Sequence, residues 1–145
     1  MVSEKLHEKI VELRARQYAS SLTGVKISNV RKEVEGEFER YRENIQEFCK
    51  IDSISSQSWE DSENVNTIAR FLCSKISAYD RNLFIPFERP FFIEIYVENC
   101  ISFLESIWKI EGTRDLTLYM VSPPAVIQLQ DLEYGFAYFE FQLDK

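Results

Sequence analysis

The sequence predicts an α+β fold in which about four helices are followed by a three-stranded antiparallel β-meander that packs on them. Apolar residues recur every three or four positions as far as Gly112, which is typical of amphipathic helices. From Leu116 onwards they alternate, which is typical of strands. The 145 residues, 45% of them hydrophobic, contain no segment that resembles a linker, so we expect residues 1–145 to form a single domain.

The first predicted helix runs from Ser3 to about Ala19. Ser3 suits the N-cap position, and the segment that ends at Gly24 supplies a stop signal. The apolar stripe of this helix, with Val11 beside it, consists of residues spaced by three or four positions: Leu6, Ile10, Leu13 and Gln17.

The second predicted helix runs from about Ser28 to Lys50 and has the most regular helical spacing in the chain. Its apolar residues are spaced by three or four positions throughout: Val30, Val34, Phe38, Tyr41, Ile45 and Phe48. The charged residues between them are of both signs, so a solvated helix face is their simplest interpretation.

A loop rich in Ser and Asp is predicted at residues 51–63, and it contains one large aromatic residue, Trp59. A third helix is predicted from about Ser62 to Tyr79. Its stripe has helical spacing and consists of Val65, Ile68, Ala69, Leu72, Ile76 and Tyr79.

A fourth helix is predicted to begin at Pro90, after a short apolar connection, and to end before Gly112. The segment Phe92–Val97 also alternates as a strand would, but helical spacing that continues for over four turns favours the helix. Most of the circumference of this helix is apolar. Its narrow polar strip would carry Glu94, Glu98 and Glu105, with Ile101 among them.

Three strands are predicted after the fourth helix, at residues 116–121, 126–130 and 134–143. The links between them are short, which indicates antiparallel pairing. In the last strand, the face expected to pack on the helices consists of Ala137, Phe139, Phe141 and Leu143. The opposite face offers candidates for surface aromatics beside a carboxylate: Tyr134, Phe136, Tyr138 and Glu140.

The net charge of −7 is unevenly distributed. Residues 1–50 carry ten basic and nine acidic side chains, whereas residues 51–145 carry seven basic and fifteen acidic ones. Nucleic-acid binding requires a concentrated basic surface, and the basic residues of the second helix are interleaved with glutamates. We therefore expect no nucleic-acid or membrane partner. An acidic surface of this kind favours a basic protein as the partner.

The residue types that most enzymes use are scarce. Cys49, Cys73 and Cys100 are widely spaced, which favours reduced, buried thiols in a cytoplasmic protein. His7 is the only histidine, and the four glycines are isolated, so neither a nucleophilic pair nor a phosphate-binding loop is indicated. No signal peptide or membrane span is recognisable. We expect no cofactor, no metal and no enzyme activity.

The function that these features favour is protein binding. We expect an inhibitor of the immunity type, which neutralises a basic partner such as a bacterial toxin, for example a nuclease, by masking its active surface. The candidate contact residues are acidic or aromatic: Trp59, Glu60, Asp61, Glu63, Glu94, Glu98, Glu105, Tyr134, Tyr138 and Glu140.

Two alternatives stay open. A small-molecule-binding protein or an enzyme would have its pocket between the fourth helix and the sheet, with Tyr96, Asn99 and Tyr119 as polar groups. A homo-oligomer is the other alternative, since Ile101 among the glutamates of the fourth helix could mark a seam between two copies.

Overall fold

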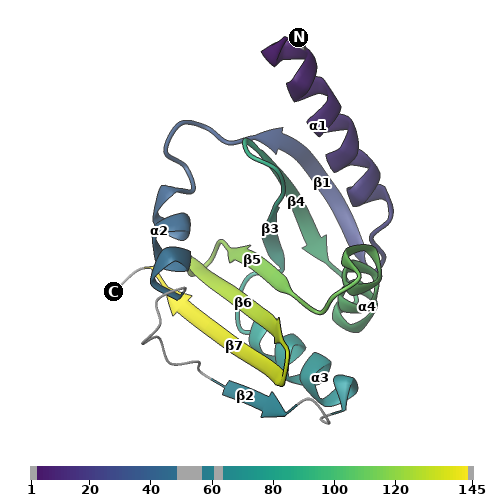
Figure 1. Ribbon diagram of the computed structural model, residues 1–145, viewed down its shortest axis with the longest axis vertical. Helices are drawn as coiled ribbons and strands as arrows, with labels where there is room; N and C mark the ends of the chain where they lie inside the picture. The colour runs from purple at the N-terminus through teal and green to yellow at the C-terminus, as the bar shows by residue number, and fades with distance from the viewer. Residues whose placement is uncertain (1–2, 49–56, 61–63, 144–145) are drawn as a thin grey trace.

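The computed structural model describes residues 3–48, 57–60 and 64–143 (Figure 1). Along these residues the elements are α1 (Glu4–Ser20), β1 (Val25–Lys32), α2 (Glu39–Phe48), β2 (Gln57–Glu60), α3 (Val65–Ile76), β3 (Asn82–Pro86), β4 (Phe91–Val97), α4 (Cys100–Glu111), β5 (Leu116–Met120), β6 (Ala125–Leu132) and β7 (Gly135–Gln142). The strands form one antiparallel sheet in the order β1-β4-β3-β5-β6-β7-β2. None of the helices in the described part of the chain has the length and apolarity needed to cross a membrane.

The predicted arrangement of four helices followed by a three-stranded meander is wrong. The described residues contain a seven-stranded sheet, and four of its strands precede the last helix in the chain. The three predicted C-terminal strands form as β5, β6 and β7 and pair in sequence order, but they are only one part of the sheet. The other strands lie in segments for which hydrophobic spacing predicts helices or loops.

Strand β1 occupies the first part of the segment predicted as the second helix, and α2 occupies the last part. Val25 and Val30 are β-branched residues that favour a strand, and β1 pairs with β4 on both sides of an irregularity between Ile27 and Asn29. Gly36, with a φ of +76°, lies in the turn that separates β1 from α2. The helical spacing of Val34 and Phe38 is therefore accidental: Val34 is 67% exposed, whereas Phe38 is 2% exposed.

The segment predicted as the fourth helix is divided between β4 and α4, so the strand alternative at Phe92–Val97 is confirmed. Successive residues of β4 lie on opposite faces of the sheet, and both faces are covered: Phe92 is 2% exposed and Ile93 is 0% exposed. A strand covered on both faces is apolar at most positions, which resembles a buried helix. Asn99 then begins α4, since its side chain accepts a hydrogen bond from the Ser102 amide at 3.1 Å.

Helices cover both faces of the sheet (Figure 1). Helices α1, α3 and α4 pack on one face, here called the first face, and bury the larger apolar cluster there. Helix α2 packs on the second face, over a smaller cluster that is mainly aromatic: Phe38, Phe84, Phe92, Tyr119, Val126, Ala137 and Phe139. The core thus lies in two layers, one on each side of the sheet.

Phe38, immediately before α2, is the anchor of the second layer. Its ring centroid lies 4.1 Å from that of Phe92, 5.0 Å from that of Phe84 and 5.4 Å from that of Tyr119. Aromatic rings at these separations attract one another beyond the burial of their area. The hydroxyl of Tyr41, one turn later, donates a hydrogen bond of 2.8 Å to the backbone oxygen of Met120.

Two ion pairs hold the connection between β1 and α2. Arg31 binds both carboxylate oxygens of Glu37, at 2.8 and 2.5 Å. Arg42 binds both carboxylate oxygens of Glu33, at 2.7 and 2.8 Å. These hydrogen bonds keep the pKa of Glu33 and of Glu37 below the ordinary value for a glutamate. Each pair therefore fixes the connection most strongly when its carboxylate is ionised.

Cys73 and Cys100 form a disulfide, contrary to the prediction of reduced thiols. Helix α3 and the first turn of α4 lie beside each other on the first face, which brings the two Cα atoms to 5.8 Å. A separation of 27 residues in the sequence carries no sign of this proximity. The third cysteine, Cys49, lies outside the described residues.

Candidate functional site

The three glutamates expected on one helical strip lie on different elements. Glu94 is on β4, paired with Asn29 of β1, and is half-buried on the second face of the sheet. Glu98 follows β4 and forms a salt bridge of 3.8 Å with Lys26. Glu105 is exposed on α4. The predicted strip does not exist, because the chain changes from strand to helix between Glu94 and Glu105.

Three of the expected surface aromatics pack against the core: Phe136 and Tyr138 are buried, and Trp59 is partly buried. The Trp59 ring lies against the first-face core, with its centroid 5.0 Å from that of Phe71 on α3. Tyr138 is 0% exposed, and its ring centroid lies 4.9 Å from that of Phe71. The expectation that Tyr138 lies on the surface is wrong because α3 covers the side of β7 that we expected to be solvated. Both faces of β7 are core faces.

Glu140 is held by intramolecular contacts. Its carboxylate accepts hydrogen bonds from the hydroxyls of Tyr138, at 2.9 Å, and Tyr79, and the Lys75 ammonium lies 4.0 Å away. Burial, together with the hydrogen bond to Glu140, raises the pKa of Tyr79 to about 12. Both tyrosines are therefore neutral donors at physiological pH, and Glu140 links the end of α3 to β7.

The structure does bring two other candidates together, at the turn between β6 and β7. Strand β2 pairs with β7 at the edge of the sheet, so Glu60 lies directly opposite Gly135. Tyr134 precedes Gly135 in the turn, and Glu60 and Tyr134 thus become spatial neighbours although they are 74 positions apart in sequence. Figure 1 shows the turn of the β6–β7 hairpin beside the end of β2.

This end of the hairpin is apolar and acidic at once. Tyr134 is 81% exposed and Leu132 is 49% exposed, and Tyr134 has the highest exposure among the large hydrophobic residues that the structure describes. The surrounding carboxylates belong to Glu60, Asp131 and Glu133. We call these five residues the acidic hairpin end. Exposed apolar side chains next to carboxylates are typical of a contact surface for a basic protein.

The adjoining backbone is held in place by carboxylates. The Asp115 carboxylate accepts a hydrogen bond from the Asp131 amide at 2.8 Å, and the Asp131 carboxylate accepts one from the Arg114 amide at 2.9 Å. These reciprocal bonds fasten the link between α4 and β5 to the end of β6. The hairpin end is therefore presented on a preformed support, which lowers the ordering cost of binding.

Sequence reasoning missed three members of this surface: Asp131, Leu132 and Glu133. The available signal was a leucine and a tyrosine in and beside a tight turn, where polar residues are usual. The candidates Asp61 and Glu63 lie outside the described residues.

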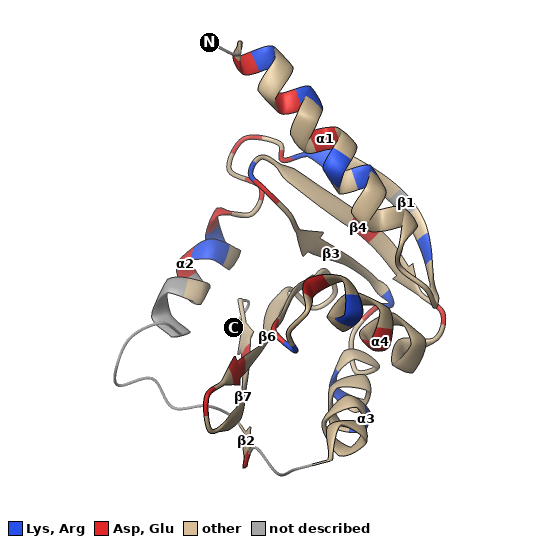
Figure 2. Ribbon diagram, turned by 45° about the vertical axis from the view of Figure 1, so that its right-hand side comes forward, with Lys and Arg blue, Asp and Glu red and all other residues tan. Residues whose placement is uncertain are grey.

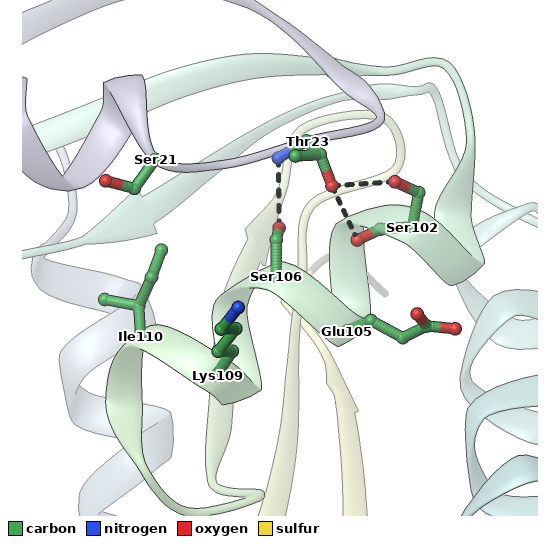
Figure 3. A pocket seen from close by; sticks show the side chains of 7 residues that line it. All are labelled: Ser21, Thr23, Ser102, Glu105, Ser106, Lys109 and Ile110. Carbon is green, nitrogen blue, oxygen red and sulfur yellow. Dashed lines mark hydrogen bonds between the residues drawn. The ribbon is translucent and has the colours of Figure 1, made fainter.

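A hollow of about 590 Å³ lies on the surface between α4 and the connection from α1 to β1 (Figure 3). Its hydroxyls bond to each other and to the backbone: Thr23 Oγ1 lies 2.7 Å from Ser102 Oγ, and Ser106 Oγ accepts a bond of 3.0 Å from the Thr23 amide. Glu105 and Lys109 also line the hollow. These hydrogen bonds attach the connection to α4, so the hydroxyls have a structural role.

A smaller hollow, of about 170 Å³, lies where α4 meets β3 and β5, the place expected for a small-molecule pocket. Sites for drug-sized ligands are usually about 300–1,000 Å³. The Tyr18 hydroxyl donates a hydrogen bond of 2.7 Å to Glu111 there, and burial together with this bond raises the pKa of Tyr18. The hollow is small, and its tyrosine is already engaged.

Within the residues that the structure describes, no group of three or more His, Cys, Asp or Glu side chains is arranged to hold a metal ion. Comparison of the sequence and fold with protein-family models, curated proteins and solved structures gives no match.

Proposed function

We propose that this chain is a protein-binding protein whose acidic hairpin end covers a basic surface of its partner. One observation carries the proposal. The pairing of β2 with β7 places Glu60 beside a turn that exposes Tyr134 and Leu132 among carboxylates.

The two kinds of side chain have different tasks in such an interface. Tyr134 buries a large area at a low entropic cost, so it supplies affinity as an anchor in a pocket of the partner. The carboxylates of Glu60, Asp131 and Glu133 attract and orient basic groups, and they accelerate association at low ionic strength. The net charge of −7 adds a long-range attraction for a cationic partner.

The narrower form of the proposal is an inhibitor of the immunity type. A basic toxin, such as a nuclease, has a cationic active surface for its own substrate, and an acidic protein that binds there blocks access. The acidic hairpin end fits this role because it combines an anchor with carboxylates that stand in for the charge of the substrate.

The test uses two matched variants of the chain. The first changes the acidic hairpin end by Glu60→Gln, Glu133→Gln and Tyr134→Ala. The control makes an equal change of charge and also removes exposed apolar atoms, though fewer of them, near α2, by Val34→Ala, Glu35→Gln and Glu43→Gln. Wild-type chain and both variants are tagged and used to capture proteins from a lysate of the source organism at low and at near-physiological salt. The captured protein is then purified and its binding to each chain is measured.

We expect the wild type and the control to retain a stoichiometric basic protein, with binding that weakens as salt rises. The hairpin variant should bind it at least about thirtyfold more weakly, since truncation of a central tyrosine anchor costs roughly 2 kcal/mol or more. Equal binding of that protein by the hairpin variant and the wild type would refute the proposal. Inhibition of an activity of the captured protein by wild-type chain would support the immunity-type form.

A further inference from the structure

Helix α1 has two apolar faces, and only one of them packs on the sheet. Val11, Ala15 and Ala19 are 1%, 0% and 3% exposed and lie against the first face. The stripe recognised in the sequence is instead solvent-exposed: Leu6 is 49%, Ile10 43% and Leu13 61% exposed. Figure 1 shows the N-terminal turns of α1 extending beyond the sheet.

The exposed stripe has the geometry of a seam for another helix. Leu6, Ile10, Leu13 and Gln17 are spaced by four, three and four positions, as are the core positions of a heptad. At 100° per residue they lie within about 60° of one another and opposite the buried face. Such a narrow stripe is typical of a helix–helix seam, whereas membrane-surface helices bury a wider apolar face.

The charges beside the stripe are basic, in contrast to the chain as a whole. On the helical geometry, Lys5, Lys9 and Arg16 border one side, and Arg14 borders the other. Arg16 and Arg14 are partly neutralised by Glu12 and Glu88, each at 2.9 Å. Among the described residues Lys5 and Lys9 form no ion pair. Figure 2 shows the acidic and basic residues distributed along α1.

We propose that this outer face of α1 binds an acidic amphipathic helix of a partner protein. Leucine-type residues of that helix would pack on Leu6, Ile10 and Leu13, and its carboxylates would pair with Lys5 and Lys9. Charge argues for this occupant, because two α1 helices that paired through their outer faces would bring basic flanks together. The site is at the far end of the molecule from the acidic hairpin end and is independent of it (Figure 1).

The test measures binding of a designed three-heptad peptide with Leu at positions a and d and Glu at positions e and g. A second peptide carries Lys in place of each Glu. The chain is used as wild type, as Leu6→Gln/Ile10→Gln/Leu13→Gln and as a matched control with exposed apolar residues changed elsewhere, Ile101→Gln/Ile110→Gln/Val121→Gln. A further variant, Lys5→Glu/Lys9→Glu, reverses the charge of the flank. Circular dichroism and thermal unfolding confirm that each variant folds.

We expect the acidic peptide to bind the wild type and the control alike, and the basic peptide to bind neither. Burial of each half-exposed Leu or Ile changes affinity roughly fivefold, so the stripe variant should bind the acidic peptide about a hundredfold more weakly. The charge-reversed variant should also lose binding to it. No binding of the acidic peptide, or equal binding of both peptides, would overturn the proposal.

Two further measurements identify other occupants. Sedimentation of the chain alone should show no association that depends on the stripe, and vesicles containing phosphatidylserine should not bind through it. Self-association or vesicle binding that the stripe variant abolishes would overturn the proposal in favour of a second copy or a membrane surface. The hairpin variant leaves α1 unchanged. If that variant no longer binds the proposed basic partner, the result therefore concerns the proposed function and not the binding of a helix by α1.

Discussion

Phe38 and Val34 give a direct test of the fold that replaces the predicted second helix. If residues 28–50 formed one helix, both side chains would lie on its apolar stripe and both would be costly to truncate. In the structure Phe38 is 2% exposed among aromatic rings of the second face, whereas Val34 is 67% exposed in the connection before α2. The variants are Phe38→Ala and Val34→Ala.

The structure predicts very different costs. Removal of a fully buried Phe leaves a cavity and loses ring contacts, which is worth about 3–5 kcal/mol of unfolding free energy. Truncation of a mostly exposed Val changes it by less than about 0.5 kcal/mol. A total stability of roughly 5–15 kcal/mol means that Phe38→Ala removes a large fraction of it and still leaves a folded protein over most of that range.

The assay is urea unfolding followed by circular dichroism and by tryptophan fluorescence, without reductant so that the disulfide stays intact. Coincident transitions justify two-state analysis, and equal slopes allow the midpoints to be compared. Similar losses for Phe38→Ala and Val34→Ala would refute the division of this segment into β1 and α2. A loss below about 1 kcal/mol for Phe38→Ala would refute the aromatic cluster under α2.

Three further predictions concern single contacts. Because the arginine partners hold the pKa of Glu33 and Glu37 below the ordinary value of 4.5, the unfolded chain binds protons first as the pH falls. The stabilisation that these ion pairs give is present above about pH 4.5 and is lost below it. The variant Glu33→Gln/Glu37→Gln should therefore be less stable than the wild type at pH 7, and its free energy of unfolding, measured in urea across pH, should decrease less as the pH falls. Gly135→Ala should detach β2 and weaken the hairpin end, because a Cβ there would lie 2.1 Å from the backbone oxygen of Trp59; amide exchange in residues 57–60 should accelerate. Glu140→Ala should cost about 1–3 kcal/mol in urea unfolding, since it leaves buried tyrosine hydroxyls without their acceptor.

Hydrophobic spacing predicted two kinds of element well. They are the helices that bury one face and the strands that pair with the strand next to them in the sequence. Helix α3 buries the stripe expected of it, including Ile68, Leu72 and Ile76, and ends within a few residues of its predicted bounds. Strands β5, β6 and β7 are joined by short links, so their pairing follows from the turns. Helix α1 lies where it was expected, but the sequence did not show which of its two apolar faces would be buried.

Two of the wrong predictions, the helix in place of β4 and the exposed position of Tyr138, have one physical origin, which is that both faces of the sheet are covered. A strand such as β4, with Phe92 under α2 and Ile93 under the other helices, has no polar side to reveal its alternation. For the same reason Tyr138 could not be recognised as a core residue. The acidic hairpin end also depends on a pairing between segments that are far apart in the sequence. Strand β2 lies at the edge of the sheet and pairs with β7, and only that pairing brings Glu60 close to Tyr134.

Amide hydrogen exchange of the chain, free and bound to the basic protein that it captures, tests the proposed function most directly. The proposed function predicts slower exchange on binding in residues 57–60 and 131–138, with the exchange of α2 unchanged. The change should be absent in the hairpin variant at the same concentrations. Slower exchange confined to α2 or to the hollow beside α4, with the hairpin end unaffected, would contradict it.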